Sequence, residues 1–273
     1  GNVTQPPKKV GEARKRQPKV EIWLPPAFQS SEEKWPLLVF SHGFGGCARQ
    51  SQSLMQYLAD QGYIVVAPDH ADANCRGRMA GSRGARDWPE RPFRTPEVWT
   101  DETEADRRDD VLFAVSSMLD DRQYKNYVDT KRMGLIGHSL GGYTVLGVAG
   151  AWPSWKDKRF KAVLAFSPYI APYLKRGGLK KVSIPVMYQG GTLDKDITPS
   201  LRSKNGAYTQ AKTPKYYIEL EGAGHFAWTD LQSRHRNIID KTSLQFLNRY
   251  VKGEKMEILP EGQDKPGKPV NKV

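Results

Sequence analysis

An α/β fold, with a mostly parallel central sheet flanked by helices on both faces, is the fold class that the sequence predicts. Segments with the pattern of a strand alternate with segments that have the periodicity of a helix along most of the chain. Several strand segments, such as residues 36–41 and 63–68, are continuous apolar runs, as expected for strands that a parallel sheet buries on both faces. The length of 273 residues suits one large domain of this class.

Local patterns define each element in turn. Residues 19–25 alternate polar and apolar side chains, as an edge strand does, and a pair of prolines ends the run. A helix over 51–61 ends at Gly62, because glycine is favoured just past a helix terminus. The next helix starts near Asp101 with acidic side chains, which the positive end of the helix dipole favours. The predicted strands are 19–25, 36–41, 63–68, 132–137, 162–166, 184–188 and 215–220, and the predicted helices are 51–61, 101–119, 140–151 and 238–250.

The chain divides into a core domain and two polar ends. Residues 1–18 are basic and contain proline, and we expect an N-terminal arm or a weak edge strand there. The α/β domain covers 19–252, and its segment 69–100 is an irregular loop expected over the rim of the active site. The tail 253–273 is rich in Lys, Pro and Gly and is expected to be disordered.

Composition excludes several classes of protein. The hydrophobic fraction of 38% indicates a soluble globular protein, and no apolar run approaches the ~18–20 residues of a membrane helix. The net charge is +12: six basic residues crowd positions 8–19, and the other basic residues, including those of the tail, are mixed with acids. We therefore expect no nucleic-acid partner, at most a weak attraction to anionic surfaces, and a monomer. No signal segment lies near Gly1.

The strongest motif is Gly-His-Ser-Leu-Gly at residues 137–141, between a predicted strand and a predicted helix. In this G-x-S-x-G context a serine sits on a tight strand-to-helix turn, and the flanking glycines remove side chains that would clash. The helix that follows directs free N–H groups at developing negative charge. The motif therefore predicts Ser139 as a catalytic nucleophile.

A second motif, His-Gly-Phe-Gly-Gly at residues 42–46, follows a buried strand. Acyl transfer needs two backbone donors for the oxyanion that forms on the carbonyl oxygen. We expect one donor to be the N–H of Leu140 and the other to be the N–H of Phe44. We expect His42 itself to be a structural hydrogen-bonding residue.

Two later loops supply candidates for the acid and the base. Asp194 and Asp196 follow the strand at 184–188; spacing alone does not separate them, and the shorter distance from the strand favours Asp194. His225 follows the last strand on a loop of small residues. A carboxylate can orient such a histidine, and the order Ser, Asp, His is typical of hydrolases with this fold.

These motifs resemble the α/β-hydrolase superfamily over residues 19–250. The runs at 39–46 (Val-Phe-Ser-His-Gly-Phe-Gly-Gly), 65–70 (Val-Val-Ala-Pro-Asp-His) and 137–142 (Gly-His-Ser-Leu-Gly-Gly) resemble the branch of platelet-activating-factor acetylhydrolases and dienelactone hydrolases, which includes bacterial lipases and cutinases. The resemblance implies hydrolysis of carboxylic esters with no cofactor and no metal. Dienelactone hydrolases use cysteine where this chain has Ser139. The acetylhydrolases place their acid after the preceding strand, where residues 166–169 hold no carboxylate, which favours Asp194 and argues against phospholipid specificity.

We therefore predict a serine carboxylic-ester hydrolase that works through an acyl-enzyme intermediate. Two alternatives are a polyesterase or lipase that acts on a polymer or lipid surface, and a catalytically silent hydrolase fold that binds a ligand.

Cys47 and Cys75 follow two strands that we expect to be neighbours in the sheet. The two cysteines could therefore form a disulfide or remain separate thiols, and a disulfide would favour a secreted or periplasmic location. The nearby Asp69, His70 and Asp72 match no familiar metal loop, and we expect them to make rim contacts.

Overall fold

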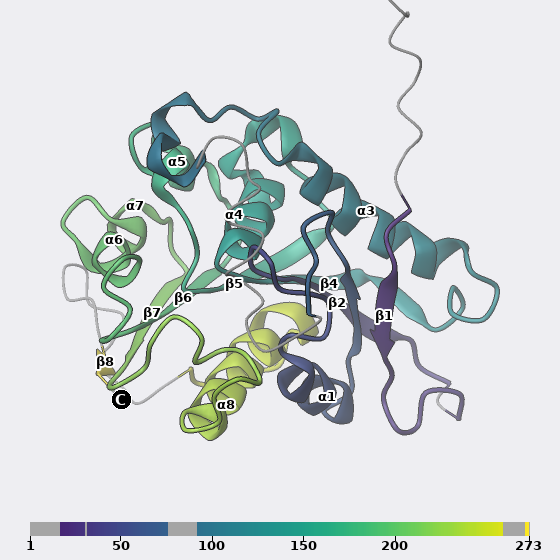
Figure 1. Ribbon diagram of the computed structural model, residues 1–273. Helices are drawn as coiled ribbons and strands as arrows, with labels where there is room; N and C mark the ends of the chain where they lie inside the picture. Colours follow the sequence, from purple (N-terminus) through teal and green to yellow (C-terminus); the bar gives the residue numbers. More distant parts are fainter. Residues whose placement is uncertain (1–16, 31, 76–91, 259–270, 273) are drawn as a thin grey trace, which may run out of the picture.

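The computed structural model describes residues 17–30, 32–75, 92–258 and 271–272 of the chain (Figure 1). Residues 1–16 of the expected N-terminal arm lie outside this part, as do residues 76–91 of the irregular loop and residues 259–270 and 273 of the expected tail. Residues 253–257 of that tail have no regular structure, and Asn271–Lys272 form a short strand.

One sheet of eight strands organises the fold in the order β1-β3-β2-β4-β5-β6-β7-β8. β1 runs antiparallel to β3, and every other neighbouring pair is parallel. The sheet is therefore mostly parallel, as the alternation of strand and helix patterns predicts. The strands are β1 (Val20–Trp23), β2 (Trp35–Ser41), β3 (Ile64–Pro68), β4 (Val128–His138), β5 (Phe160–Phe166), β6 (Val186–Gly191), β7 (Lys215–Leu220) and β8 (Asn271–Lys272).

Helices cover both faces of the sheet. In the view of Figure 1, α1 and α8 lie below the sheet, and α3 and α4 lie above it. The α-helices are α1 (Gln52–Asp60), α3 (Ala105–Asp120), α4 (Leu140–Leu146), α5 (Ala171–Leu174), α6 (Thr198–Arg202), α7 (Ala207–Gln210) and α8 (Arg236–Leu247). Shorter or wider helical turns are η1 (Pro92–Arg94), η2 (Pro96–Val98), η3 (Gly147–Ala151), η4 (Pro153–Trp155), η5 (Gly178–Lys181) and η6 (Asn248–Lys252).

The alternation of side chains along each strand builds two hydrophobic layers. Leu37 and Val39 of β2 belong to the layer between the sheet and helices α3 and α4. Leu38 and Phe40 belong to the layer between the sheet and helices α1 and α8. Both kinds of side chain are fully buried, because successive residues of a strand point to opposite faces of a sheet that is covered on both sides. The continuous apolar runs in the sequence follow from this double burial.

Several element boundaries differ from the sequence-based expectation. β4 begins at Val128 rather than at residue 132, β6 covers Val186–Gly191 rather than 184–188, and two helices differ for reasons that the backbone shows. The helix expected from Asp101 begins only at Ala105, because Glu104 adopts a left-handed conformation (φ 59°) that cannot continue a helix, and residues 101–104 form a turn instead. The helix expected over 140–151 is a regular α-helix only to Leu146. The wider turn η3 continues it over Gly147–Ala151, with a kink at Gly150, whose φ is 124°.

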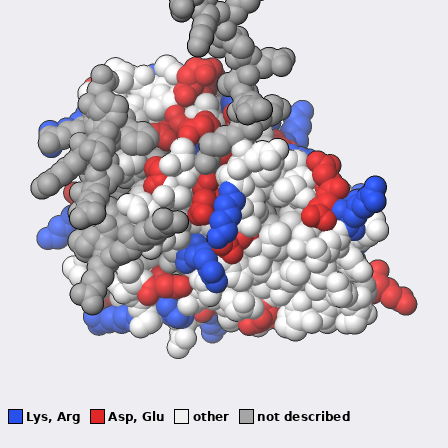
Figure 2. Space-filling model, turned by 45° about the vertical axis from the view of Figure 1, so that its right-hand side comes forward, with Lys and Arg blue, Asp and Glu red and all other residues white. Residues whose placement is uncertain are grey.

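The face of the molecule drawn in Figure 2 carries charges of both signs. On this face, Lys and Arg side chains lie next to Asp and Glu side chains. Within the described ranges, no helix combines the length and the apolar character needed to cross a membrane.

Candidate active site

Ser139 lies on a sharp turn between β4 and α4. Its backbone angles (φ 55°, ψ −118°) are strained for a residue with a side chain, which is typical of residues that the surrounding fold holds in place for a function. Glycine is required on both sides of the turn. A Cβ on Gly137 would overlap the backbone of Gly141, and a Cβ on Gly141 would overlap the carbonyl of Ser41 at the end of β2.

Ser139, His225 and Asp194 are joined by consecutive hydrogen bonds. The His225 Nε2 lies 2.9 Å from the Ser139 Oγ, and the His225 Nδ1 lies 2.7 Å from the Asp194 Oδ2. A carboxylate only accepts, so the neutral imidazole carries its proton on Nδ1 and leaves Nε2 free to accept the serine hydroxyl proton. Three loops, after β4, β6 and β7, meet in this arrangement at the carboxyl edge of the sheet.

Burial and hydrogen bonding act in opposite directions on Asp194. Its side chain is 4% exposed, and that burial by itself would raise its pKa. Hydrogen bonds from His225 and Ser167, together with the positive charge that His225 carries when it is protonated, outweigh burial, so the pKa of Asp194 lies below its usual value and the carboxylate stays ionised. Asp196, the alternative acid, is exposed to solvent.

Ser167, after β5, also belongs to this arrangement, and the sequence analysis did not identify it. Its hydroxyl donates to the Asp194 Oδ2 and lies 3.2 Å from the His225 Nδ1. Its φ of 40° is again unusual for a residue with a side chain. The signal that sequence reasoning could have used is its place at the carboxyl end of a strand next to β4.

The segment 42–46, which we call the oxyanion turn, lies directly against Ser139. A Cβ on Gly43 would lie 3.3 Å from the Ser139 Cβ. Leu140, the other expected donor, is the first residue of α4. The two N–H groups expected to bind an oxyanion therefore come from segments that flank the serine.

A chain of side-chain hydrogen bonds links the oxyanion turn to the histidine loop. The Gly43 N–H donates to the Gln50 Oε1 over 3.1 Å, and the Gln50 Nε2 donates to the His138 Nδ1 over 3.0 Å. The His138 Nε2 donates in turn to the His225 carbonyl over 2.8 Å. Burial and the neighbouring His225 charge lower the pKa of His138 to about 3, so its ring remains neutral.

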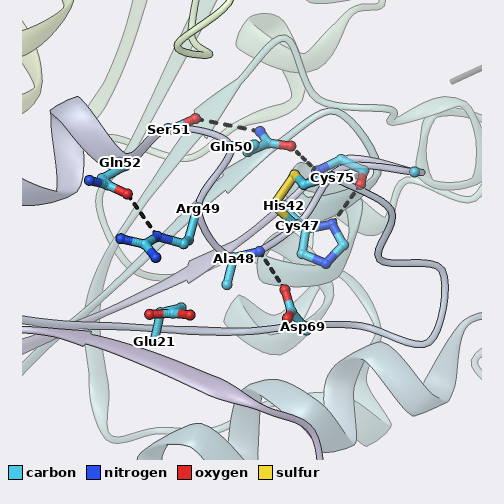
Figure 3. The surroundings of a disulfide bond; sticks show 12 residues. Glu21, His42, Cys47, Ala48, Arg49, Gln50, Ser51, Gln52, Asp69 and Cys75 are labelled. Carbon is cyan, nitrogen blue, oxygen red and sulfur yellow. Dashed lines mark hydrogen bonds between the residues drawn. A yellow bond between two sulfur atoms is a disulfide. The ribbon is translucent and has the colours of Figure 1, made fainter. Parts of the chain in front are cut away.

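A disulfide cross-links the chain in the same region. Cys47, just after the oxyanion turn, is bonded to Cys75, and the two Cα atoms lie 5.6 Å apart (Figure 3). Backbone and side-chain hydrogen bonds run beside it: the Asn74 N–H donates to the Gly46 carbonyl, and the Ala48 N–H donates to the Asp69 carboxylate. The structure thus closes the question that the sequence left open, because the cysteines form a bridge.

The residues that superficially suggest a metal site have other partners. Asp69 and Cys75 make the contacts described above. His70 lies between Ser41 and Asp110: its Nε2 lies 2.8 Å from the Ser41 Oγ, and its Nδ1 lies 2.9 Å from the Asp110 Oδ2. Asp72 pairs with Arg107. These contacts connect β2, β3 and α3 behind the oxyanion turn.

Aromatic rings lie on one side of the serine. Phe44 and Tyr169 are half-buried, and Phe93 contacts both, with centroid distances of 5.6 and 5.1 Å. The Tyr169 N–H donates to the Ser139 carbonyl over 2.9 Å, so the backbone of Tyr169 lies beside the site. The other aromatic residues near the motifs belong to the core: Tyr143, Tyr173 and Trp228 are buried.

Comparisons with known proteins identify a family for this chain. The sequence model of the Esterase family, described as "Putative esterase", matches residues 11–237. The chain is 23% identical over 263 residues to a platelet-activating factor acetylhydrolase of Cavia porcellus (80% of this chain, 58% of the relative) and 24% identical over 242 residues to that of Gallus gallus (77% and 56%). It is 30% identical over 142 residues to cutinase 2 of Thermobifida cellulosilytica (50% and 49%). The chain thus spans about half of the length of the curated relatives it matches.

The disulfide generates a stability prediction. Cys47 and Cys75 are 28 positions apart, and closing a loop of that size stabilises a fold by about 3–4 kcal/mol in the chain-entropy model. The double variant Cys47→Ala/Cys75→Ala is expected to unfold with a free energy lower by roughly that amount, measured by urea denaturation. A reductant should lower the midpoint of the parent protein and leave the double variant unchanged. Equal midpoints for the oxidised parent and the variant would contradict the prediction.

Proposed function

Because the chain belongs to the Esterase family of α/β-hydrolase fold, we propose that it is a serine hydrolase that cleaves carboxylic esters through an acyl-enzyme intermediate. The observation that carries the proposal is the consecutive hydrogen bonding of Ser139, His225 and Asp194 at 2.9 and 2.7 Å. These are distances over which a proton can be transferred. The names of the relatives, an acetylhydrolase and a cutinase, support ester substrates.

In the acylation step, the Ser139 Oγ attacks the ester carbonyl while the His225 Nε2 takes its proton. The ionised Asp194 stabilises the imidazolium and holds the ring in the required tautomer. The imidazolium then donates the proton to the alcohol as it leaves, and the acyl group remains on Ser139. In deacylation, His225 takes a proton from water, which attacks the acyl carbon. The imidazolium then returns this proton to the Ser139 Oγ as the ester bond to the serine breaks and the acid is released.

The negative charge that develops on the carbonyl oxygen needs donors in both steps. We assign this role to the N–H groups of Phe44 and Leu140, which flank Ser139. Fixed donors of this kind lower the barrier because they need no reorganisation when the charge appears. The aromatic rings of Phe44, Phe93 and Tyr169 then provide an apolar wall for one side of the ester.

We also propose an extracytoplasmic location. The Cys47–Cys75 disulfide supports it, since such bonds persist in oxidising compartments.

Replacing the nucleophile tests the proposal. Ser139→Ala is expected to lower kcat for a p-nitrophenyl ester by roughly 10⁴-fold or more, because no acyl-enzyme can form. Ser30→Ala, in an exposed turn after β1, is the matched control and should keep full activity. The parent protein, but not Ser139→Ala, should be labelled by a fluorophosphonate. An unlabelled parent protein without esterase activity would favour a catalytically silent binding fold.

A pair of asparagine variants tests the acid. Asp194→Asn is expected to lower kcat by roughly 10⁴-fold, because the amide no longer holds the His225 tautomer or stabilises its charge. Asp196→Asn, on the same loop but exposed, should leave kcat within about twofold. Steady-state kinetics of both variants on the same ester make the comparison, and the reverse order of effects would assign the role to Asp196.

A specific observation favours a second candidate, hydrolysis at a polymer or lipid surface. Among the described residues, large apolar side chains with high exposure include Leu193 (62%), Phe226 (47%) and Leu231 (75%). Leu193 precedes Asp194, Phe226 follows His225, and Leu231 is on the same loop as His225. Exposed apolar side chains gathered around a site mark a surface for binding a partner or an interface.

The double variant Leu193→Ser/Leu231→Ser tests this second candidate. Adsorption to an insoluble polyester film or a triglyceride emulsion should weaken by roughly tenfold or more, because apolar area no longer leaves water on binding. Activity on a dissolved p-nitrophenyl ester serves as the internal control and should persist. Equal adsorption by the parent protein and the double variant would restrict the proposal to dissolved esters.

A further inference from the structure

A buried arginine, Arg107 of α3, lies directly behind the oxyanion turn. Its side chain is 0% exposed. A charged side chain is almost never buried to this extent without fixed partners, because removing a charge from water is costly. The partners of Arg107 are therefore informative about why the fold keeps it there.

The guanidinium contacts the backbone of the oxyanion turn and the Asp72 carboxylate, and its Nε also lies 3.9 Å from the Glu104 Oε2. Its Nη1 donates to the His42 carbonyl over 2.8 Å, and its Nη2 donates to the Gly43 carbonyl over 3.3 Å. Its Nη2 also lies 2.9 Å from the Asp72 Oδ2, and its Nε lies 3.2 Å from the Asp72 Oδ1. The Asp72 Oδ2 accepts in addition from the Gly45 N–H over 2.8 Å. The Arg107–Asp72 pair thus binds the turn at three of its residues, 42, 43 and 45.

The Gly43 carbonyl receives more donors than an ordinary turn carbonyl. Besides Arg107, the His42 Nδ1 donates to it over 2.7 Å and the Gly46 N–H over 3.0 Å. The roles of His42 are set by its partners: its Nε2 accepts the His70 N–H over 3.0 Å, so its Nδ1 carries the proton. Three donors on one oxygen fix the plane of the peptide that joins Gly43 to the next residue.

That peptide is the one that carries the N–H of Phe44. In a trans peptide the C=O and N–H bonds point in opposite directions, so a carbonyl held towards Arg107 directs the Phe44 N–H away from it. A cation on the carbonyl side also draws electron density from the N–H and makes it a stronger donor. Water does not screen this effect, because both Arg107 and Asp72 are buried.

We propose that Arg107 is a positioning residue that orients and polarises the Phe44 N–H for the oxyanion, with Asp72 as its counter-ion, an inference that rests on the proposed esterase function. The requirement is for a guanidinium. Only its planar fork can reach two carbonyls and a carboxylate together, whereas a lysine ammonium is a single point charge. The Cys47–Cys75 bridge holds the segment that carries Asp72.

The charge-conserving variant Arg107→Lys tests this role. It retains the positive charge opposite Asp72 but cannot hold both carbonyls, so kcat for a p-nitrophenyl ester should fall by roughly tenfold or more, with KM nearly unchanged. Complete loss of one oxyanion donor costs about 10²–10³ in kcat, which bounds the effect. Arg159→Lys is the matched control. Arg159 pairs with Asp157 before β5, at the opposite edge of the sheet, and this variant should keep the parent kcat.

A second substrate separates positioning from a merely structural effect. In a thiono ester the carbonyl oxygen is replaced by sulfur, which accepts hydrogen bonds weakly, so the donors contribute little. The ratio of kcat/KM for the oxygen ester to that for the thiono ester should therefore fall by about tenfold in Arg107→Lys. A loss of folded protein would lower both values equally and leave the ratio unchanged.

The outcomes are distinct. If Arg107→Lys has the same kcat and the same ratio of the two esters as the parent protein, the inference is wrong but the esterase proposal stands. If the parent protein shows no ester hydrolysis that depends on Ser139, both are wrong. If thermal unfolding shows that Arg107→Lys is not folded, Asp72→Asn decides. It keeps the shape of the carboxylate but weakens the hold on Arg107, and the ratio should fall in the same direction. An unchanged ratio in a folded Asp72→Asn then overturns the inference.

Discussion

The arrangement of the site depends on one close approach between two backbones. Gly141 of α4 packs against the end of β2, where a Cβ would overlap the Ser41 carbonyl and come within 2.7 Å of the His42 carbonyl. No other residue type fits such a contact without displacing α4. Because Ser139 lies just before α4 and the oxyanion turn just after β2, this contact brings the proposed nucleophile and both proposed donors to one place.

Side chains that follow β5 and β6 both reach the Nδ1 of the His225 imidazole. The Asp194 carboxylate lies 2.7 Å from the His225 Nδ1, and the Ser167 hydroxyl lies 3.2 Å from it. The acetylhydrolases that this chain resembles carry their acid after the strand that corresponds to β5, whereas Asp194 follows β6. The resemblance is compatible with this difference, because both positions reach the same imidazole nitrogen. The loop positions lie side by side in space, because β5 and β6 are neighbours in the sheet.

The sheet and the proposed triad could be predicted from the sequence because their signals are local. Apolar runs reflect burial on both faces, and Ser139, Asp194 and His225 each follow a strand within a short motif. Arg107 could not be predicted, because it sits on a helix like many exposed arginines and its partners at 42 and 43 lie 65 and 64 positions away. The start of α3 was misplaced because acidic residues favour a helix terminus, whereas Glu104 is held in a left-handed turn.

The buried ring of His138 has a consequence for acid tolerance. Because burial lowers its pKa to about 3, the native state keeps the ring neutral, whereas the unfolded chain binds a proton below the ordinary histidine pKa of 6.5. The unfolded state then holds more protons, so acidification from about pH 6.5 towards pH 3 progressively favours unfolding. Since the same ring connects Gln50 to the His225 loop, its protonation would break contacts in the region that carries the proposed chemistry.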